Sequence, residues 1–388
     1  MVRIEVARVR VVRSPSRIAS SEITAPMDQF AEHRGRRSSW YGGMDTVLVE
    51  IGADGLDGGA PVGLAATQGG DAVAALLAGH LLPLALGVSL TSSDDIMRLY
   101  ERLRLATLPY GSGGLAAMAR SAIDIAVWDL FGKATATPVF ELLGGTARSL
   151  PVYATGNEIE HHRALGFTAS KVGLQSGPWH TAGARAAKDQ IELARDRAGS
   201  DHVLMVDGWM GLDVAFIAEI APTLRRAEVE WLEEPLQPDD LGGLREAARA
   251  LGEVGLATGE HLTTRADLLS TANCGVRILQ PDLAWCGGIS EVRALVPHLP
   301  PHMEIAPHLS GTPWGVHVAA AFPQVRRVEW YVESEPGEPI SAEKGPLTGG
   351  SIPQNGAIAP VDAPGLGLST DMEFLDRWAE STRVCHAL

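Results

Sequence analysis

The chain has 388 residues, of which 45% are hydrophobic and 20% are charged, so it can bury a large core and is neither disordered nor a coiled coil. Its 47 Asp and Glu residues outnumber its 32 Lys and Arg residues. The formal net charge of −15 argues against nucleic acid as a partner, because an acidic surface repels phosphate backbones. The three cysteines have no paired spacing, which indicates a reducing compartment, and no apolar run reaches the roughly 18 residues of a membrane span. We therefore expect a cytoplasmic protein that binds no membrane.

The first part of the chain, residues 1–130, predicts a small α+β domain. Val2–Val12 and Thr46–Ile51 alternate apolar and polar residues, as half-buried antiparallel strands do. From Asp71 to Lys133 the pattern becomes helical, and Leu115–Phe131 carries apolar residues at spacings of three and four. These patterns indicate a domain in which strands come first and helices follow.

Residues 131–350 show a different, repeating pattern of short apolar runs, which is typical of a parallel barrel. Amphipathic stretches such as Thr181–Arg197 and Val214–Arg226 separate short apolar runs, and alternating strands and helices form a parallel sheet. Recurrence at about 25 residues predicts a closed (β/α) barrel. The predicted strands are Pro151–Ala154, Ser170–Val172, Val203–Val206, Glu230–Leu232, Gly255–Thr258, Arg277–Leu279, Glu304–Ala306 and Arg327–Val328.

The tail, residues 351–388, is expected to pack back on the first domain and to make that domain discontinuous. The chain after Pro346 is rich in Gly and Pro and is predicted to end in a short helix, Met372–Trp378. A segment of this composition is too short to form a domain of its own, so we expect it to complete the N-terminal domain.

Ionisable residues follow the predicted barrel strands at their C-terminal ends, where parallel barrels carry their active sites. These residues are Lys171, Asp207, Glu233, Glu260, Asp282, His308 and Glu329. Asp207, Glu233 and Glu260 end three consecutive strands, and converging carboxylate oxygens suit an octahedral cation, most naturally Mg²⁺. A single carboxylate of this kind is usually a surface group, but the regular spacing makes that reading improbable for all three.

Two further groups are predicted to flank this metal site. Asp282 and His308 end neighbouring strands, and an Asp beside a His fixes its tautomer and makes it a general base. Lys171 lies across the mouth of the barrel. A base on each side of a metal-bound substrate is what removal of a proton next to a carboxylate requires, and the metal stabilises the resulting enediolate.

The stretches that hold these residues resemble the enolase superfamily, in its mandelate racemase-like branch. The resemblance covers nearly the whole chain and rests on Ala122–Asp129 with Gly132-Lys133, Leu142–Gly145, Val206-Asp207, Trp231–Pro235 and Thr258–Glu260. It implies a modified (β/α)7β barrel with an α+β capping domain that the C-terminal segment completes. It also implies that Glu233 rather than Glu234 is the ligand, and that Glu329 hydrogen-bonds a developing enediolate oxygen.

Within this branch, several stretches resemble the L-rhamnonate dehydratases. These are Tyr110–Gly114, Tyr153–Gly156, Asp207–Met210, Gly259–His261, Gln280–Asp282 and Trp285–Gly288. Related dehydratases carry a His two residues after the first metal ligand, where this chain has Trp209, so the resemblance implies that His308 does the acid work. The family usually has two lysines on the second strand, and of these this chain has only Lys171. Whether Lys171 acts as an acid/base or as a carboxylate clamp stays open.

Substrate binding is expected from a loop over the barrel and from residues beside the metal ligands. Met27–Trp40 resembles the capping-domain loop that closes over substrate, and arginine suits carboxylates and polyols. The expected substrate-binding residues are His33, Arg36, Arg37, Trp209 and His261. A solvated basic loop and a packing role for Trp209 are the alternatives.

The leading hypothesis is a Mg²⁺-dependent lyase that dehydrates a sugar acid, such as L-rhamnonate, to a 2-keto-3-deoxy acid. A racemase, epimerase or cycloisomerase that uses the same proton abstraction is the first alternative, and the absence of the paired second-strand lysines argues mildly against it. A non-catalytic scaffold is the second alternative, although such a protein should have lost at least one of these residues. We expect a homo-oligomer, from dimer to octamer, with a small-molecule substrate.

Overall fold

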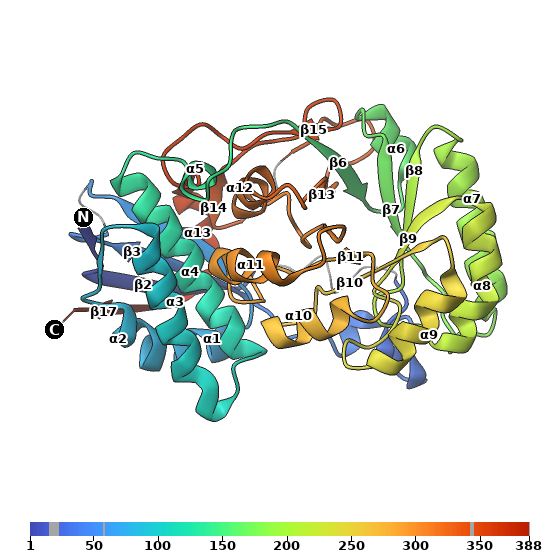
Figure 1. The fold of residues 1–388 in the computed structure, drawn as a ribbon, viewed down its shortest axis with the longest axis horizontal. Coiled ribbons are helices and arrows are strands. Elements are labelled where there is room, and N and C mark those ends of the chain that lie inside the picture. Colours follow the sequence, from blue (N-terminus) through green and yellow to red (C-terminus); the bar gives the residue numbers. More distant parts are fainter. Residues whose placement is uncertain (15–22, 57–58, 342–344, 388) are drawn as a thin grey trace.

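The N-terminal strands form an antiparallel sheet whose alternating apolar residues face a layer of helices. The computed structural model describes residues 1–14, 23–56, 59–341 and 345–387 (Figure 1). The sheet has the order β17-β2-β3-β4, and a short pair of strands, β1 and β5, lies beside it. The bounds are β1 (Val2–Arg3), β2 (Val6–Val12), β3 (Thr46–Gly52), β4 (Val62–Thr67), β5 (Ser89–Leu90) and β17 (Ala379–His386). The predicted strand Val2–Val12 is thus divided in two.

The capping helices cover one face of this sheet, and the longest of them, α4 (Leu115–Ala134), is buried around most of its circumference. It packs on β3 and β4 on one side and on α11 (Ile289–Leu295) of the barrel on the other, which explains its uniformly apolar sequence. The other elements here are α1 (Gly70–Leu76), the π-helix η4 (Leu77–Leu81), α2 (Leu82–Ala85), α3 (Ser93–Thr107) and the 3-10 helix η5 (Leu108–Tyr110).

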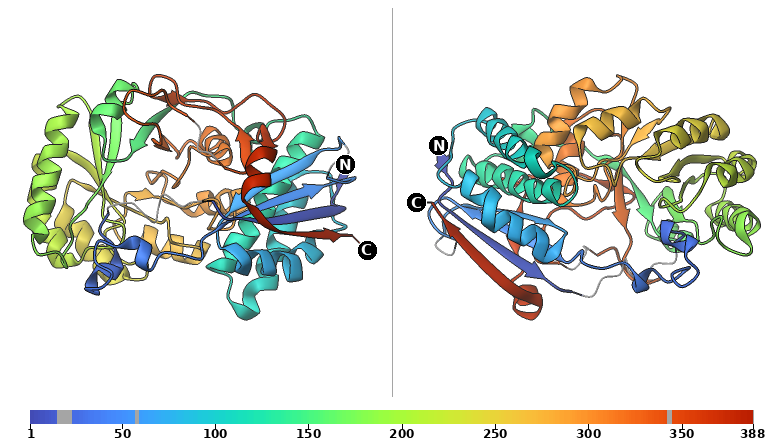
Figure 2. Two further views of the ribbon diagram at one scale, coloured as in Figure 1. Left: turned by 180° about the vertical axis from the view of Figure 1, so that it is seen from behind. Right: turned by 90° about the horizontal axis from the view of Figure 1, so that it is seen from below.

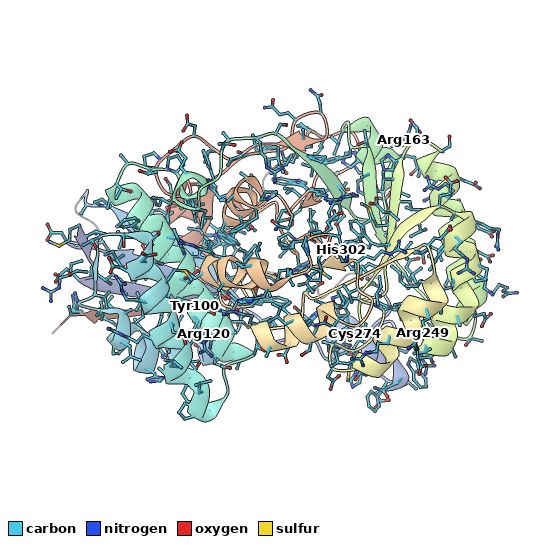
Figure 3. The ribbon with its side chains drawn as sticks, in the orientation of Figure 1. Tyr100, Arg120, Arg163, Arg249, Cys274 and His302 are labelled. Carbon is cyan, nitrogen blue, oxygen red and sulfur yellow. The ribbon has the colours of Figure 1, made fainter. Side chains whose placement is uncertain are left out.

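A buried arginine joins the two long capping helices. Arg120 of α4 donates to Thr107 Oγ1 at 2.8 Å and to the carbonyl oxygen of Ser112 at 2.7 Å, so its guanidinium closes the connection between α3 and α4. Tyr100 of α3 lines the same small cavity, and Figure 3 shows the two side chains near each other in this domain. Burial lowers the pKa of Arg120 to about 10, which leaves it charged at neutral pH.

The barrel strands form one curled parallel sheet in the order β12-β11-β10-β9-β8-β7-β6-β13. A parallel bridge between Ile305 and Val325 links its two ends. The bounds are β6 (Leu150–Thr155), β7 (Ala169–Gly173), β8 (Val203–Asp207), β9 (Val229–Glu233), β10 (Gly255–Thr258), β11 (Ile278–Leu279), β12 (Glu304–Ile305) and β13 (Val328–Tyr331). The strands and the barrel architecture predicted from the sequence are confirmed, with ends that differ by no more than three residues.

Side-chain alternation along these strands sets the position of the site. A layer of apolar side chains fills the inside of the barrel, and it consists of Tyr153, Ala169, Met205, Trp231, Ala257, Ile278 and Ala306. Their neighbours, such as Leu204 and Val206, face outward and pack under the helices. Because successive strand residues point to opposite faces, a residue two positions after an inner one also points inward. Met205 and Trp231 point inward, so Asp207 and Glu233, two positions later on the same strands, point into the barrel mouth as well.

Helices surround the parallel sheet, and α7, α8 and α9 lie side by side on its outer surface (Figure 1). Helix α8 has the predicted bounds. Its start is fixed by Asp213, whose side chain accepts a hydrogen bond from the amide of Phe216. The bounds are α5 (Val139–Leu142), α6 (Ile159–Ala164), α7 (Gly183–Ala198), α8 (Val214–Arg226), α9 (Leu241–Leu251), α10 (Arg265–Ala272), the 3-10 helix η6 (Val296–His298) and α12 (Pro313–Ala321).

The C-terminal segment returns to the capping domain, as expected, but ends in a strand that the sequence did not predict. Strand β17 pairs with β2 along its whole length and forms the edge of the capping sheet (Figure 2). Its side chains are mostly exposed and polar, so no apolar alternation marks it. The remaining elements are β14 (Leu347–Gly349), β15 (Ala357–Ile358), β16 (Leu368–Thr370) and α13 (Met372–Trp378). Among the helices of the described residues, none has the length and apolar character needed to cross a bilayer.

Asp129 is the buried connection among these segments and provides a test of the fold. Its carboxylate accepts the amide of Leu64 at 2.9 Å, the amide of Leu366 at 2.7 Å and the ammonium of Lys133 at 2.6 Å. Asp129→Ala leaves the two amides without a partner and removes the counter-charge of Lys133, which keeps only the carbonyl oxygens of Val62 and Leu368. We therefore expect the free energy of unfolding to fall by about 3–5 kcal/mol in urea titrations.

The control for this prediction is Asp189→Ala, on the exposed face of α7, which should change the free energy of unfolding by less than about 0.5 kcal/mol. If Asp129→Ala lost less than about 1 kcal/mol, the C-terminal segment would be held mainly by its apolar contacts.

Candidate active site

The ionisable residues predicted at the strand ends come together at the mouth of the barrel. All of the predicted catalytic and metal-ligating residues are buried, and the most exposed of them, His308, has 7% of its surface exposed. The capping loop lies over them: in Figure 1 the blue segment that holds the 3-10 helices η2 (Pro26–Gln29) and η3 (Arg37–Ser39) has left the capping sheet and lies beside the barrel. The amide of Thr24 donates to the carbonyl oxygen of Leu174 at 2.6 Å, which attaches this loop to the end of β7.

Lys171 lies among three carboxylates. Its ammonium hydrogen-bonds Glu233, lies 2.7 Å from Glu329 Oε1 and lies 3.7 Å from Asp207 Oδ2. Burial by itself would lower the pKa of Lys171, but the carboxylates of Glu233, Glu329 and Asp207 outweigh it and raise the pKa well above its ordinary value. Lys171 is therefore a buried cation that offsets the charge of its neighbours.

Asp207 and Glu233 differ in how their charge is compensated. Glu233 Oε2 accepts Trp231 Nε1 at 3.0 Å and Gln280 Nε2 at 2.6 Å, while its other oxygen faces Lys171. Asp207 accepts one backbone amide, that of Trp209, at 2.9 Å. Burial and then repulsion from Glu233 raise the pKa of Asp207 well above its ordinary value, despite the opposing effect of Lys171. A cation near Asp207 would relieve this unfavourable charge.

The predicted Asp–His pair is formed. His308 Nδ1 lies 2.8 Å from Asp282 Oδ2, and Asp282 Oδ1 accepts the amide of Ala284 at 2.7 Å. Nε2 of His308 therefore faces the mouth, where Glu260 Oε1 lies 3.6 Å away. Burial lowers the pKa of His308, but the charge of Glu260 and the hydrogen bond that the imidazole donates to Asp282 raise it to about 10.

A second carboxylate–imidazole pair lies beside the first. Glu234 Oε2 is 2.8 Å from His261 Nδ1, and His261 Nε2 is 3.8 Å from Glu260 Oε1. The ligand atoms of Glu234, Glu260 and His261 lie within 4.8 Å of one another, so these residues form a second possible ligand set besides Asp207, Glu233 and Glu260. Burial lowers the pKa of His261, but the charges of Glu234 and Glu260 raise it to about 9.

The capping loop contributes one of its three predicted residues to this mouth. The guanidinium of Arg37 lies 3.4 Å from the ring centre of Trp209, and burial lowers its pKa against the attraction of Tyr41, Asp207 and Glu260. His33 instead contacts Ser39 Oγ within the loop at 2.8 Å, and Arg36 is exposed. The structure thus brings Arg37, Trp209 and His261 together, and not His33 or Arg36.

Aromatic rings line the mouth in an unbroken series. Trp209 lies 5.8 Å from His261, His261 lies 5.5 Å from Trp285, and Trp285 lies 5.9 Å from His308. Trp285 Nε1 also hydrogen-bonds Gln68, so the capping domain holds one member of the series in place. Along this wall of the site, the apolar rings of Trp209 and Trp285 alternate with the imidazoles of His261 and His308.

Sequence reasoning missed four residues of this site: Gln280, Trp285, Glu234 and Tyr331. Gln280 and Trp285 stand in stretches quoted for the resemblance but were assigned no role. Glu234 has a left-handed backbone, with φ of 35°, as does Leu309 after His308, with φ of 49°. Such strain in residues other than glycine is concentrated at functional sites, but only coordinates reveal it. Tyr331 lies two residues beyond Glu329, so strand alternation could have found it.

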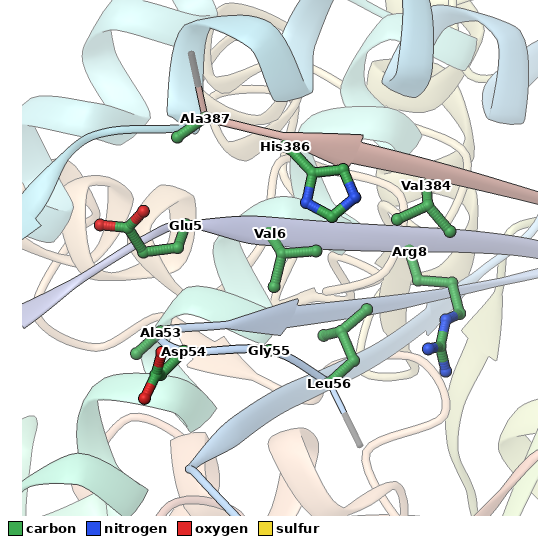
Figure 4. A pocket seen from close by; sticks show the side chains of 10 residues that line it. All are labelled: Glu5, Val6, Arg8, Ala53, Asp54, Gly55, Leu56, Val384, His386 and Ala387. Atoms are coloured by element: carbon green, nitrogen blue, oxygen red, sulfur yellow. The ribbon is translucent and has the colours of Figure 1, made fainter. Parts of the chain in front are cut away.

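A hollow elsewhere among the described residues lacks the features of an active site. It has a volume of about 690 Å³ on the outer face of the capping sheet (Figure 4). Its charged lining residues are Glu5, Arg8 and Asp54, with His386 from the C-terminal strand. No cluster of metal-ligating atoms from the described residues faces it, so we place the active site at the barrel mouth.

The charge balance around Lys171 can be tested through stability. Lys171→Ala removes the ammonium among Asp207, Glu233 and Glu329, so we expect the free energy of unfolding at pH 8 to fall by about 3–5 kcal/mol. A carboxylate whose pKa is raised in the folded state lowers the stability of the protein as pH rises above the pKa of that group in the unfolded chain. The loss of stability caused by Lys171→Ala should therefore be smaller at pH 5 than at pH 8. Urea titrations at both pH values measure this.

The matched control is Lys188→Ala, whose ammonium lies 2.8 Å from Glu219 at the surface. An exposed ion pair contributes about 0–1 kcal/mol, so this variant should be nearly neutral at both pH values. A Lys171→Ala variant with the same small deficit at pH 5 and pH 8 would contradict the assigned charge balance.

Comparison with known proteins agrees with this geometry. Residues 41–144 match the family described as the mandelate racemase / muconate lactonizing enzyme N-terminal domain, and residues 155–374 match the enolase C-terminal domain-like family. L-rhamnonate dehydratase of Saccharopolyspora erythraea is 36% identical over 275 residues, which cover 70% of this chain and 69% of that protein.

Solved structures show the same fold. Rhamnonate dehydratase from Gibberella zeae complexed with Mg is 27% identical, with a TM-score of 0.89 over 97% of this chain and 96% of that chain. A racemase from Streptomyces coelicolor with bound magnesium is also 27% identical, with a TM-score of 0.77 over 97% of this chain and 100% of that chain. The protein therefore belongs to the enolase superfamily, in its mandelate racemase-like branch and near the rhamnonate dehydratases.

Proposed function

We propose that the protein dehydrates a sugar acid to a 2-keto-3-deoxy acid in a Mg²⁺-dependent reaction. The observation that carries this proposal is the 2.8 Å contact between His308 Nδ1 and Asp282 Oδ2, which turns Nε2 of the same ring toward the carboxylates of the mouth. The relatives named as rhamnonate dehydratases support the reaction type and suggest an aldonate such as L-rhamnonate as substrate.

The donor set at the mouth fits a divalent cation. Asp207 and Glu233 end the adjacent strands β8 and β9, and Glu260 lies two residues after the end of β10. These three residues supply hard oxygen ligands and carry more negative charge than Lys171 offsets. We assign the ion to these three residues rather than to Glu234, because side-chain alternation along β8 and β9 directs Asp207 and Glu233 into the barrel mouth. When bound, the ion supplies positive charge that binds the substrate carboxylate and offsets Glu260, which lowers the pKa of His308 toward that of a base.

The residues of the chain divide the remaining work. His308 Nε2 removes the proton from C2 of the substrate, and Asp282 holds the ring in the required tautomer. The C3–O bond then breaks, its electrons leave with the oxygen, and the proton on His308 Nε2 converts the leaving group to water. The buried ammonium of Lys171 stabilises the negative charge that develops on the substrate carboxylate, because its raised pKa keeps it protonated.

A racemase or epimerase is the second candidate function, and the position of Lys171 favours it. Strands β7 and β12 are separated in the sheet by β8, β9, β10 and β11, so Lys171 and His308 approach the mouth from different sides. The Streptomyces coelicolor neighbour is named as a racemase, which makes this the natural competitor. The high pKa of Lys171 argues against it, since a base must lose its proton.

The assignment of the ligands predicts the response to metal. At about 100 times its dissociation constant, Mg²⁺ should raise the free energy of unfolding by about 2.7 kcal/mol, and chelation should abolish turnover. Glu260→Gln should weaken Mg²⁺ binding by more than about tenfold in calorimetric titrations. If Glu234→Gln lost binding while Asp207→Asn kept it, the ion would belong to the Glu234, Glu260 and His261 set instead.

The role of His308 predicts a loss of chemistry without a loss of structure. His308→Asn should reduce keto acid formation at least about 1,000-fold and leave Mg²⁺ binding and the melting temperature near those of the unchanged protein. Asp282→Asn should also be strongly impaired, because the imidazole loses the group that sets its tautomer. A semicarbazide assay of acid sugars measures the keto acid.

Deuterium incorporation distinguishes the two candidate functions. In D₂O, a dehydratase with His308 as its base should show neither exchange at C2 nor product in the His308→Asn variant. A two-base racemase should still exchange the C2 proton of one enantiomer, because Lys171 survives. Such exchange, together with no keto acid from any sugar acid in the unchanged protein, would favour the racemase.

A further inference from the structure

Tyr331 places a hydroxyl group beside the active nitrogen of His308. It is the last residue of β13, two positions after Glu329, and both side chains therefore point into the barrel mouth. Its hydroxyl lies 3.5 Å from His308 Nε2, and its ring stands edge-on to the imidazole, with 6.2 Å between the ring centres and an interplanar angle of 89°. The ring thus packs against His308 while the hydroxyl faces the same space as Nε2.

The backbone of Tyr331 is held in the barrel sheet, so the position of its hydroxyl does not depend on a flexible loop. Tyr331 pairs with Thr155 of β6 in the barrel sheet, and Thr155 Oγ1 donates to Glu329 Oε1 at 2.7 Å. The side chain nevertheless remains 41% exposed, in contrast to the buried residues around it. Tyr331 therefore lies on the open side of the site, where a substrate enters.

The hydroxyl is held weakly enough to take another partner. A separation of 3.5 Å is long for a hydrogen bond between oxygen and nitrogen, which is usually about 2.7–3.0 Å. Two groups at this separation can both reach a single oxygen placed between them at about 2.8 Å from each. Glu329, Glu260 and Asp207 all act electrostatically on the Tyr331 hydroxyl, so an oxygen in this position would also lie beside the proposed metal site.

From this geometry we infer that Tyr331 is a catalytic residue that donates a hydrogen bond to the C3 hydroxyl oxygen of the substrate as that group leaves. This inference rests on the proposed dehydration. The proton that completes water comes from His308 Nε2, and the electrons of the C3–O bond stay with the oxygen. Tyr331 keeps its own proton and stabilises the negative charge that grows on the leaving oxygen.

The proposal separates two steps that share His308. Removal of the C2 proton needs His308 but not Tyr331, whereas departure of the C3 hydroxyl needs both. Tyr331→Phe keeps the ring against His308 and removes only the hydroxyl, so it should slow keto acid formation about 10- to 100-fold. Exchange of the C2 proton for deuterium should stay within about threefold of that of the unchanged protein, so the ratio of exchange to elimination should rise.

Three comparisons make this test sharp. A 3-deoxy analogue of the substrate has no oxygen at C3, so the unchanged protein and Tyr331→Phe should exchange its C2 proton at equal rates. Tyr110→Phe removes a tyrosine hydroxyl that contacts His80 within the capping domain, and it should change neither rate. Tyr331→Leu removes the ring as well and shows what packing alone contributes.

Each outcome decides the role of Tyr331. Equal losses of exchange and elimination in Tyr331→Phe, or elimination at the rate of the unchanged protein, would overturn it. If Tyr331→Phe had the rates of the unchanged protein while Tyr331→Leu lost both exchange and elimination, the hydroxyl would have no role. The ring of Tyr331 would then only hold the imidazole of His308 in place. If the unchanged protein exchanged C2 but formed no keto acid from any acid sugar, the proposed dehydration itself would fail, which the first two outcomes do not imply.

Discussion

The crowding of negative charge at the barrel mouth is the constraint on which the rest of the site depends. Six carboxylates are buried there: Asp207, Glu233, Glu234, Glu260, Asp282 and Glu329. Isolated buried charges are very unfavourable, so each needs a counter-charge or donors. Lys171, His261 and His308 supply this compensation, and the high pKa of each reflects it. The excess charge at Asp207 is what a divalent cation is suited to balance.

The capping domain holds this charged mouth in shape. Thr67 Oγ1 donates to the carbonyl oxygen of Ala284 at 2.7 Å, and Asp124 Oδ2 accepts the amide of Ser290 at 2.9 Å. The loop between β11 and α11, which carries Asp282, is therefore clamped by groups from the other domain. Because His308 depends on Asp282 for its tautomer, the geometry of the imidazole depends on the packing between the two domains.

The same physical rule gives buried acids different roles in the two domains. Asp129 has two backbone amides and Lys133 as partners, which makes it a structural connection with no group left to react. Within the part of the chain that the structure describes, Glu260 in contrast has only imidazole nitrogens at 3.6 and 3.8 Å, longer than hydrogen bonds. Burial is common to both residues, and the difference lies in how completely each carboxylate is paired.

The sequence by itself determined the barrel strands, the inward step from Met205 to Asp207 and the neighbour relation of Asp282 and His308, because these follow from periodicity along the chain and from the order of strands. Tertiary structure alone decided that Arg37 and not Arg36 reaches Trp209, and that Tyr331 meets His308. It also decided that β17 pairs with β2. These contacts join segments far apart in the chain. Periodicity can show on which face of a strand a residue such as Tyr331 lies, but it does not show which distant side chain that residue meets.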